Sequence, residues 1–325
     1  MKKIILLSIL GYCFAMVGCQ KEEYGLPVLK DALQNDALKR KFGPNIAGQY
    51  IDFAYAIAIP ATKGKIVSAQ VEASIPGGSQ TYFDPKSYYT NTGGVDVGVE
   101  VAGASVNNGN ITSINLTKDT NAVTFRYYYQ VPEAAKGQEV SFTFSAKSSN
   151  GETVSYKLGP YAISRMDMVR TLPVSDNNLM FISIADMKVY NAVQAAANPE
   201  KIDLVYSYKN ISGASFNHAL VAPSASEYLT GITLPQGVNN DSKLIRVFGL
   251  QDRDLSQLQY ALYVDDVDLV QKDFSTAPNF ALDMKVDYGL WVETADKKYR
   301  AYVYINSVNN SGKSAVVSMK RIAMN

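Results

Sequence analysis

The chain has 325 residues, of which 47% are hydrophobic, and its 31 basic and 30 acidic side chains nearly balance. This length predicts about two domains, and this hydrophobic content is sufficient for each of them to bury a core. The balanced charge and the lack of a basic tract argue against a protein that binds nucleic acid through its phosphate backbone.

The first residues have the organisation of a secretory signal. Lys2 and Lys3 precede an apolar run over residues 4–15, which is shorter than the roughly 20 apolar residues that a membrane-spanning helix needs. Small residues follow and end at Cys19, an arrangement that resembles the lipobox of bacterial lipoproteins. The resemblance implies that residues 1–18 are a cleaved lipoprotein signal peptide and that Cys19 is the site of lipid attachment. The alternative is an ordinary cleaved signal followed by an incidental cysteine.

The mature chain is expected to start with a lipidated tether over residues 19–43, which contains one short helix and holds the protein at the outer membrane. Losing Lys2 and Lys3 from the 31 basic residues leaves 29 against 30 acidic ones, a formal charge of −1. Cys13 leaves with the signal, so no disulfide is expected in the folded part. Residues 21–23, Lys-Glu-Glu, resemble the export signal that directs lipoproteins of Bacteroidetes to the outer cell surface. That resemblance implies an extracellular location, and a solvated charged tether is the alternative.

Residues 44–160 alternate between apolar and polar side chains in seven short runs, the pattern of half-buried β-strands. In the first run, Phe53 and Tyr55 alternate with alanines, which suits a central strand with a close neighbour. Asn150 and Gly151 supply the positive-φ pair of a tight hairpin between the last two runs. Seven such strands predict an immunoglobulin-like β-sandwich. The runs span residues 51–59, 67–75, 95–101, 111–116, 123–131, 140–146 and 154–158.

Gly159 and Pro160 mark the end of this domain, and residues 161–178 have the composition of a linker. Residues 179–325 are expected to form a second, mostly-β domain with a few short helices. The fold class predicted for the whole chain is therefore mainly β. In this second domain, strands are expected at residues 180–183, 202–208, 244–250, 261–264, 282–287, 290–294, 299–306 and 315–321, and helices at residues 185–198 and 254–260.

Short runs spread over nearly the whole mature chain carry a family likeness. They include SFTFSA at residues 141–146 and WVETAD at residues 291–296, and the others lie at residues 53–56, 125–129, 149–153, 159–161, 166–168 and 299–302. These runs resemble a family of two-domain surface lipoproteins from Bacteroidetes, a domain of unknown function. The resemblance implies the two domains and the outer-membrane setting, but no catalytic or binding residues. It also implies, by association with accessory lipoproteins of glycan-uptake systems, that polysaccharide and a transporter complex are partners.

The sequence offers little for catalysis or metal binding. Zinc sites take three or four protein ligands and a Ser-His-acid triad needs a histidine, but the chain has one histidine, His218, which is expected on the surface. Residues 312–314, Gly-Lys-Ser, resemble the end of a phosphate loop but are better explained by a hairpin turn. The acidic patch from Asp252 to Asp268 is interpreted as a solvated edge or as helix caps and turn formers; a cation site, or a hydrolytic carboxylate pair that includes Asp266, is the alternative. We therefore expect a protein that is not an enzyme and that takes no cofactor or metal.

Aromatic residues gather in one loop-like stretch, where Tyr82, Phe83, Tyr88 and Tyr89 lie among acids, an amide and a lysine. Aromatic rings bind sugars by covering their C–H faces while polar neighbours take the hydroxyl groups. These four residues and Trp291 are therefore the candidate ligand-binding residues. The alternative is a packing role, as a cap on one end of the sandwich or, for Trp291, in a core or domain interface.

Together these features predict a non-enzymatic, outward-facing lipoprotein of the outer membrane that binds glycan or another extracellular ligand for an uptake system. The alternative is a structural adhesin or pilus-type subunit. In that case, cleavage at residues 39–41, Lys-Arg-Lys, would free a sheet edge for strand donation.

Overall fold

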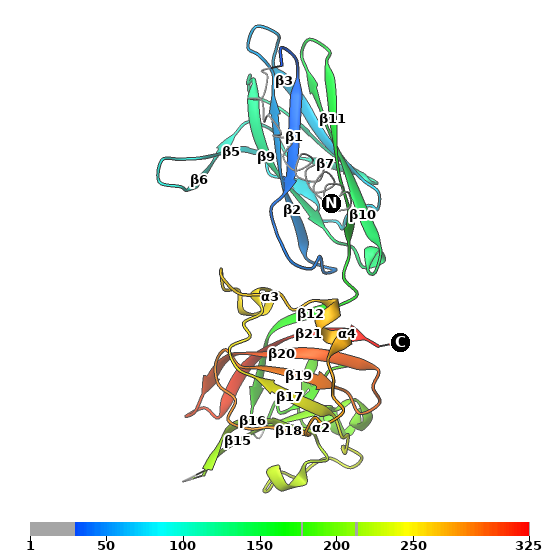
Figure 1. The fold of residues 1–325 in the computed structure, drawn as a ribbon, viewed down its shortest axis with the longest axis vertical. Helices are drawn as coiled ribbons and strands as arrows, with labels where there is room; N and C mark the ends of the chain where they lie inside the picture. Colours follow the sequence, from blue (N-terminus) through cyan, green and yellow to red (C-terminus); the bar gives the residue numbers. More distant parts are fainter. Residues whose placement is uncertain (1–29, 177, 212–213, 325) are drawn as a thin grey trace, which may run out of the picture.

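The computed structural model describes residues 30–176, 178–211 and 214–324, which form two β domains stacked end to end (Figure 1). The predicted signal peptide and Cys19 lie outside these residues. None of the helices in the described ranges is long and apolar enough to cross a membrane. The fold is mainly β, as predicted.

Two antiparallel sheets packed around one hydrophobic core form the N-terminal domain. Its strands are β1 (Gln34–Lys39), β2 (Tyr50–Ala58), β3 (Ile66–Ala73), β4 (Tyr82–Phe83), β5 (Lys86–Thr90), β6 (Asp96–Glu100), β7 (Val106–Asn108), β8 (Ile111–Asn115), β9 (Ala122–Gln130), β10 (Glu139–Ser148) and β11 (Thr153–Ala162), with a 3₁₀ turn η1 (Glu133–Ala135). The sheet orders are β1-β2-β9-β4 and β11-β10-β3-β8-β7. They follow the A-B-E-D and G-F-C orders of an immunoglobulin domain, with β8 and β7 added beyond β3. The β5–β6 hairpin projects from the side of the sandwich (Figure 1).

The alternation of apolar residues fills the space between these two sheets with aromatic rings. Phe53 lies on β2, and its ring centroid is 4.7 Å from that of Phe142 and 5.3 Å from that of Phe144, both on β10. Tyr129 of β9 packs edge-on against Phe142 at 4.9 Å. The described residues include no cysteine, so these interlocking rings hold the sandwich together without a disulfide.

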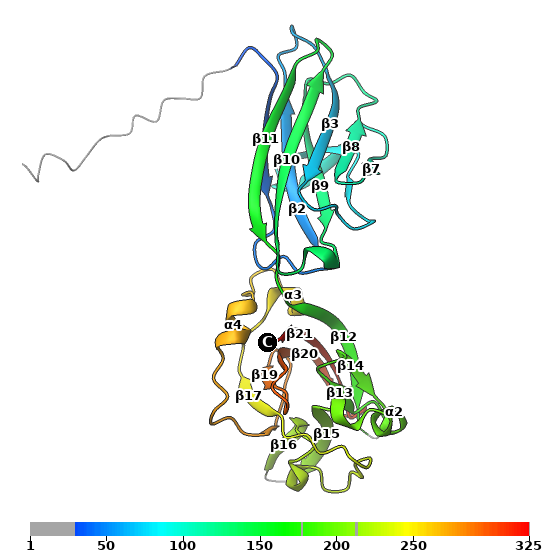
Figure 2. The same cartoon turned by 90° about the vertical axis from the view of Figure 1, so that its right-hand side faces the viewer.

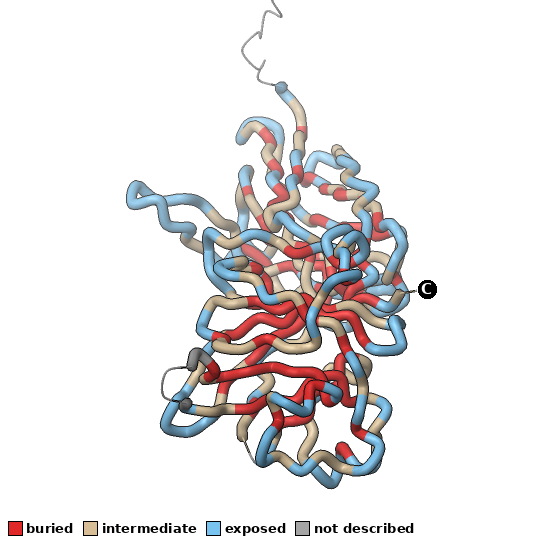
Figure 3. Tube along the Cα trace, turned by 60° about the horizontal axis from the view of Figure 1, so that its bottom comes forward, coloured by how far each residue is buried: buried red, intermediate tan, exposed pale blue. Residues whose placement is uncertain are grey.

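The C-terminal domain is likewise a pair of antiparallel sheets around a hydrophobic core, and here each sheet has five strands (Figure 2). Its strands are β12 (Asp167–Ser175), β13 (Phe181–Ser183), β14 (Lys188–Tyr190), β15 (Leu204–Ile211), β16 (Ala214–Val221), β17 (Lys243–Val247), β18 (Phe280–Ala281), β19 (Gly289–Glu293), β20 (Tyr299–Asn309) and β21 (Ser314–Ala323); its helices are α2 (Ala192–Ala196), α3 (Arg253–Ser256) and α4 (Asp266–Gln271), with 3₁₀ turns η2 (Pro199–Lys201) and η3 (Ser226–Tyr228). The sheet orders are β12-β21-β20-β19-β17 and β14-β13-β15-β16-β18. Figure 3 shows that the buried segments follow the strands of both domains.

The segment expected to be a tether contributes a strand to the sandwich. β1 pairs with β2 along its whole length, and Leu33 and Ala37 enter the core. A spacing of four residues fits one face of a strand as well as one face of a helix, which is why the sequence suggested a short helix here. The N-terminal domain therefore begins before residue 44.

The segment expected to be a linker, residues 161–178, is also mostly strand. It contains the end of β11 and all of β12, which pairs with β21. A bulge lies between Val169 and Leu172, and Thr171 has a φ of 58°. The bulge breaks the alternation of the side chains, so the strand has no clear signal in the sequence.

The expected helix over residues 185–198 is short because its N-cap is Asn191. The Asn191 side chain accepts a hydrogen bond from the Gln194 N–H, and the Gln194 side chain accepts one from the Asn191 N–H. Ser183 belongs to β13, and its hydroxyl oxygen accepts a hydrogen bond from the Asp186 N–H in the following turn. The strand expected at residues 282–287 is likewise absent from the described structure.

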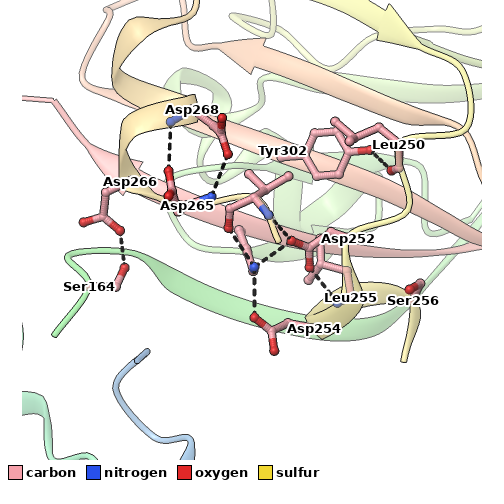
Figure 4. Close-up of polar contacts among 12 residues, drawn as sticks. Ser164, Leu250, Asp252, Asp254, Leu255, Ser256, Asp265, Asp266, Asp268 and Tyr302 are labelled. Atoms are coloured by element: carbon pink, nitrogen blue, oxygen red, sulfur yellow. Dashed lines mark hydrogen bonds and ion pairs between the residues drawn. The ribbon is translucent and has the colours of Figure 1, made fainter. Parts of the chain in front are cut away.

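The two domains meet through polar contacts and a small hydrophobic cluster that includes Ile46. The hydroxyl of Ser164, just after β11, donates a hydrogen bond to the carboxylate of Asp266 on α4 (Figure 4). Lys41, just after β1, forms an ion pair with Asp254 of α3, with an N–O distance of 2.9 Å. Polar and charged side chains from both domains therefore fix the junction.

Candidate functional site

Two of the predicted ligand-binding residues, Phe83 and Trp291, are buried and cannot contact a ligand, so the prediction was wrong for both. Phe83 is 1% exposed, and its ring lies 5.7 Å from that of Phe125 inside the sandwich. Trp291 is 5% exposed and packs 4.7 Å from Tyr302. Successive side chains of a strand point to opposite faces, so Phe83 turns inward where its neighbour Tyr82 turns outward. Trp291 lies on β19, an inner strand of its sheet.

The other three predicted residues, Tyr82, Tyr88 and Tyr89, lie over the outer face of the β1-β2-β9-β4 sheet. Tyr82 is 40% exposed and stacks on Tyr128, with centroids 5.0 Å apart and an interplanar angle of 21°. Both rings meet Tyr50 edge-on, and we call Tyr50, Tyr82 and Tyr128 the tyrosine cluster. Tyr88 and Tyr89 come from β5, which lies against β9. The sheet thus gathers on one face aromatic residues from separate parts of the chain.

A groove with a volume of 480 Å³ runs over this face, and we call it the outer-face groove. Ala56 and Ala58 of β2 form much of its floor. Tyr88 and Tyr89 line one side, and residues 34–36 at the start of β1 line the other. Because alanine side chains are short, the sheet surface stays open between the taller side walls.

The two tyrosines that line the outer-face groove are held differently. The Tyr88 hydroxyl donates a hydrogen bond of 2.6 Å to Asp84, and the guanidinium of Arg126 lies 5.1 Å from the Tyr88 ring centroid. Arg126 is in turn fixed by an ion pair of 2.7 Å with Asp96. The hydrogen bond to Asp84, together with partial burial, raises the pKa of Tyr88 to about 12. Tyr89, by contrast, is 56% exposed, so its ring is open to solvent.

A second hollow, with a volume of 720 Å³, lies where the same sheet face meets the C-terminal domain, and we call it the junction cleft. Tyr50 and Tyr128 line it from the N-terminal domain, and Tyr263 lines it from the C-terminal domain. Two ion pairs are built into its wall. Arg40 pairs with Asp52 at 2.5 Å, and Lys41 pairs with Asp254.

The Asp52 carboxyl in this wall is partly buried. Burial raises its pKa, and the nearby Arg40 and Arg126 oppose that rise. Two further arginines of the lining, Arg170 and Arg253, are exposed. The junction cleft therefore combines aromatic rings with an excess of basic side chains.

The acidic patch is occupied by structural contacts (Figure 4). Asp252 caps α3 by accepting a hydrogen bond of 2.9 Å from the Leu255 N–H, and it also accepts one of 2.7 Å from the ammonium of Lys320. Asp265 caps α4 in the same way, and Asp268 accepts a hydrogen bond of 3.0 Å from the Asp265 N–H. Asp252 and Asp265 are helix caps, as interpreted from the sequence. Asp252 is also buried with Lys320, so it is not part of a solvated edge.

Asp266, the residue considered for hydrolysis, accepts hydrogen bonds from Ser164 and from the Arg165 N–H at the domain junction. Within the described ranges, no group of three or more His, Cys, Asp or Glu residues is placed to hold a metal ion. The Gly-Lys-Ser run at residues 312–314 lies at the turn between β20 and β21, as predicted.

His218 is buried, not on the surface as expected. It is 3% exposed on β16, where its Nδ1 lies 2.6 Å from the Tyr206 hydroxyl and its Nε2 lies 2.7 Å from Asn310 Oδ1. An amide oxygen can only accept, so Nε2 carries the proton and Nδ1 accepts from Tyr206. The sequence around His218 looked like a loop, but it forms a strand paired with β15.

The sequence did not reveal the junction cleft. Its lining comes from residues 40–52, Tyr128, Arg170 and residues 253–263, which only the domain contact brings together. The one available signal was the alternation along β2 and β9. It places Tyr50 and Tyr128 among the side chains that point out of the sandwich.

The fold and its surface define a two-domain β protein with a ligand-sized groove on an immunoglobulin-like sandwich. Residues 30–163 match the family model of a domain of unknown function, DUF4466, and residues 164–324 match that of a second one, DUF8576. The crystal structure of a DUF4466 family protein from Parabacteroides merdae is 47% identical to this chain, with a TM-score of 0.85. The match covers 90% of this chain and 99% of that one. The chain belongs to the DUF4466 family.

Two other solved structures are similar over smaller parts. The major pilin subunit BcpA of Bacillus cereus is 13% identical, with a TM-score of 0.27, covering 48% of this chain and 49% of that one. AvmM, which catalyses macrocyclization in alchivemycin A biosynthesis, is 10% identical, with a TM-score of 0.23, covering 42% and 93%. These scores are too low to bear on fold or function. None of the curated proteins compared with the chain matches it.

Proposed function

We propose that this protein is a non-enzymatic lipoprotein, anchored to the outer membrane and facing outward, that binds glycan for an uptake system. The observation that carries the proposal is the outer-face groove, in which Tyr88 and Tyr89 stand beside a floor of alanines. A transporter complex of the outer membrane is the proposed recipient of the ligand.

The chemistry of the outer-face groove suits a sugar. A sugar ring has apolar C–H faces and a rim of hydroxyl groups, so it needs both a flat aromatic surface and polar partners. The exposed ring of Tyr89 supplies the first, and Gln34 and Asp36 on the opposite side supply an amide and a carboxylate. A volume of 480 Å³ lies within the range of small-ligand sites, roughly 300–1,000 Å³.

The proposed setting rests on the start of the chain. The apolar run and Cys19 support a lipid anchor, and the Lys-Glu-Glu run at residues 21–23 supports export to the cell surface. A membrane-anchored binder at that surface has direct access to extracellular polysaccharide.

The test is a binding survey with the full mature chain carrying Cys19→Ala, so that the protein carries no lipid. We expect at least one polysaccharide to bind, and Tyr89→Ala to weaken that binding by about 10- to 30-fold, the size expected when an aromatic anchor is lost. Tyr156→Ala is the matched control, because Tyr156 is 37% exposed on β11 of the other sheet. Absence of binding across a broad panel of plant, host and bacterial glycans would refute the proposal.

A pilus-type subunit or adhesin is the second candidate, and β1 is the feature that favours it. β1 is the edge strand of its sheet, and the Lys-Arg-Lys run at residues 39–41 starts at its last residue. Cleavage there and loss of β1 would uncover β2 for a strand donated by another subunit. Cell-surface protein that lacks residues before 40 and runs as a ladder of oligomers would support this function. Intact chain recovered as a stable monomer would contradict it.

A further inference from the structure

We infer that the junction cleft is a binding site for acidic saccharides, those carrying carboxylate or sulfate groups. This inference rests on the proposed function and names the class of glycan. It draws on the charge, the aromatic lining and the position of the cleft.

The charges that line the junction cleft do not cancel. Arg40 pairs with Asp52, and Lys41 pairs with Asp254. Neither Arg170 nor Arg253, however, forms an ion pair with another residue of the described chain, although both belong to the lining. These two guanidinium groups leave the cleft with two unmatched positive charges.

The acids beneath the junction cleft do not neutralise this excess. The carboxylates of Asp252 and Asp254 both contact the buried ammonium of Lys320, at 2.7 and 3.0 Å. With Lys41, the group contains two carboxylates and two ammonium groups, so it is balanced on its own. The guanidinium of Arg253 instead lies 5.8 Å from the Tyr263 ring centroid.

The chemistry of these side chains selects the ligand. A guanidinium presents a planar set of N–H donors that matches a carboxylate or a sulfate with two parallel hydrogen bonds. Tyr50, Tyr128 and Tyr263 line the same cleft and give it aromatic surface beside these arginines. Aromatic rings beside arginines that form no ion pair with the described residues, in a hollow of 720 Å³, fit an acidic saccharide better than a neutral one.

The junction cleft and the outer-face groove lie over one sheet face. Tyr50, Asp52, Ala56 and Ala58 point outward on the same side of β2, because residues two apart in a strand share a face. Tyr50 and Ala56 are six positions apart, which is about 20 Å of strand at about 3.4 Å per residue. A single polysaccharide chain can therefore contact both hollows along this face of the sheet.

The experiment compares acidic and neutral glycans on the full mature chain carrying Cys19→Ala. The probes are polygalacturonate for carboxylate, chondroitin sulfate for sulfate, and neutral galactan and dextran. We expect at least one acidic probe to bind more tightly than the neutral probes, and its affinity to fall at high salt. The double variant Arg170→Ala/Arg253→Ala should weaken acidic binding by about 10-fold or more, since two charge-assisted contacts are lost. Neutral binding should not change.

The controls separate this inference from the proposed function. Arg165→Ala removes an exposed arginine near the junction but outside the cleft lining, and it should leave all affinities unchanged. Acidic binding that is unaffected by the double variant, or no tighter than neutral binding, would overturn the inference. The proposed function would survive that result if a neutral glycan bound and Tyr89→Ala weakened it. If the chain bound none of the acidic and neutral probes, both the inference and the proposed function would be refuted.

Discussion

The N-terminal and C-terminal domains share a two-layer β architecture but fill their interiors differently. The N-terminal core is built from aromatic rings, and Arg126, at 9% exposed, is the only buried charged side chain among its described residues. The described part of the C-terminal domain buries several charged groups near its helices and strand ends. They are Asp203, Asp252, Asp254, Glu293 and Lys320.

This difference assigns separate roles to the two domains. The N-terminal sandwich, whose core is mostly aromatic, provides a rigid sheet, and the outer face of this sheet carries the outer-face groove. The buried charges of the C-terminal domain hold α3 and the loop that follows it, and these segments form one wall of the junction cleft. Changes in buried charge should therefore disturb the cleft and leave the groove intact.

The largest expected effect comes from Lys320→Met. Lys320 is fully buried between Asp252 and Asp254, so its removal leaves two buried carboxylates without an ammonium inside the domain. We expect the free energy of unfolding of the C-terminal domain to fall by about 3–5 kcal/mol, measured by chemical denaturation. Lys298→Met, in an exposed pair with Asp296, is the control and should have a much smaller effect. An equal fall in the free energy of unfolding of the N-terminal domain would contradict the separate roles of the two domains.

Asp203→Asn should change how stability depends on pH. Asp203 is 4% exposed, and burial raises its pKa from 3.8 to about 7. The folded state thus binds this proton more tightly than the unfolded state. Its contribution to stability is complete below pH 3.8 and is lost as pH rises through about 7.

Denaturation at pH 4 and at pH 7.5 measures this effect. Relative to Asp203→Asn, which keeps an acceptor for the Ile184 N–H, the natural protein should lose stability over this interval. A difference of one between the folded-state and unfolded-state pKa changes the free energy of unfolding by about 1.4 kcal/mol. Parallel pH profiles for the two proteins would show that Asp203 is not the group responsible.

Ala56→Trp should block the outer-face groove without unfolding the sandwich. Ala56 is exposed on the groove floor, so the indole ring extends into the groove and not into the core. Glycan affinity should fall by about 10-fold or more, while the free energy of unfolding stays within about 0.5 kcal/mol. Ala134→Trp, at an exposed position of η1, is the control. Equal affinities for the two variants would place the binding site elsewhere.

The smallest expected effect comes from Lys41→Ala, which removes the ion pair across the junction. Lys41 has a side-chain exposure of 34%, so stability should change by no more than about 1 kcal/mol. Acidic glycans should bind a few times more weakly, because the junction cleft loses a positive charge. Lys63→Ala removes a more exposed ion pair with Asp31, away from the cleft, and serves as the control in the same titration.

The sequence predicted the parts of the protein that depend on local pattern. Alternation around Phe53 and Phe142 identified the sandwich, and the run from Tyr82 to Tyr89 identified one wall of the outer-face groove. The sequence did not show that Tyr82 is exposed and Phe83 buried. The side chain of β4 that points into the core is set by the pairing of this two-residue strand with β9.

Features that depend on distant segments could not be predicted. The bulge at Thr171 concealed β12, and the spacing of Leu33 and Ala37 fitted a helix as well as a strand. The junction cleft joins Arg40 to Arg253 across more than 200 residues, and no local pattern records that contact. For the same reason, the sequence around His218 did not predict its hydrogen bond with Asn310.

We propose that glycan binds over the outer face of the sandwich. Hydrogen–deuterium exchange of the mature chain, measured with and without a bound polysaccharide, shows which strands the glycan covers. We expect slower exchange in β2, β5 and β9 when glycan is present, and no change in β10 and β11 on the other sheet. Protection confined to β10 and β11, or to the C-terminal domain, would contradict the account.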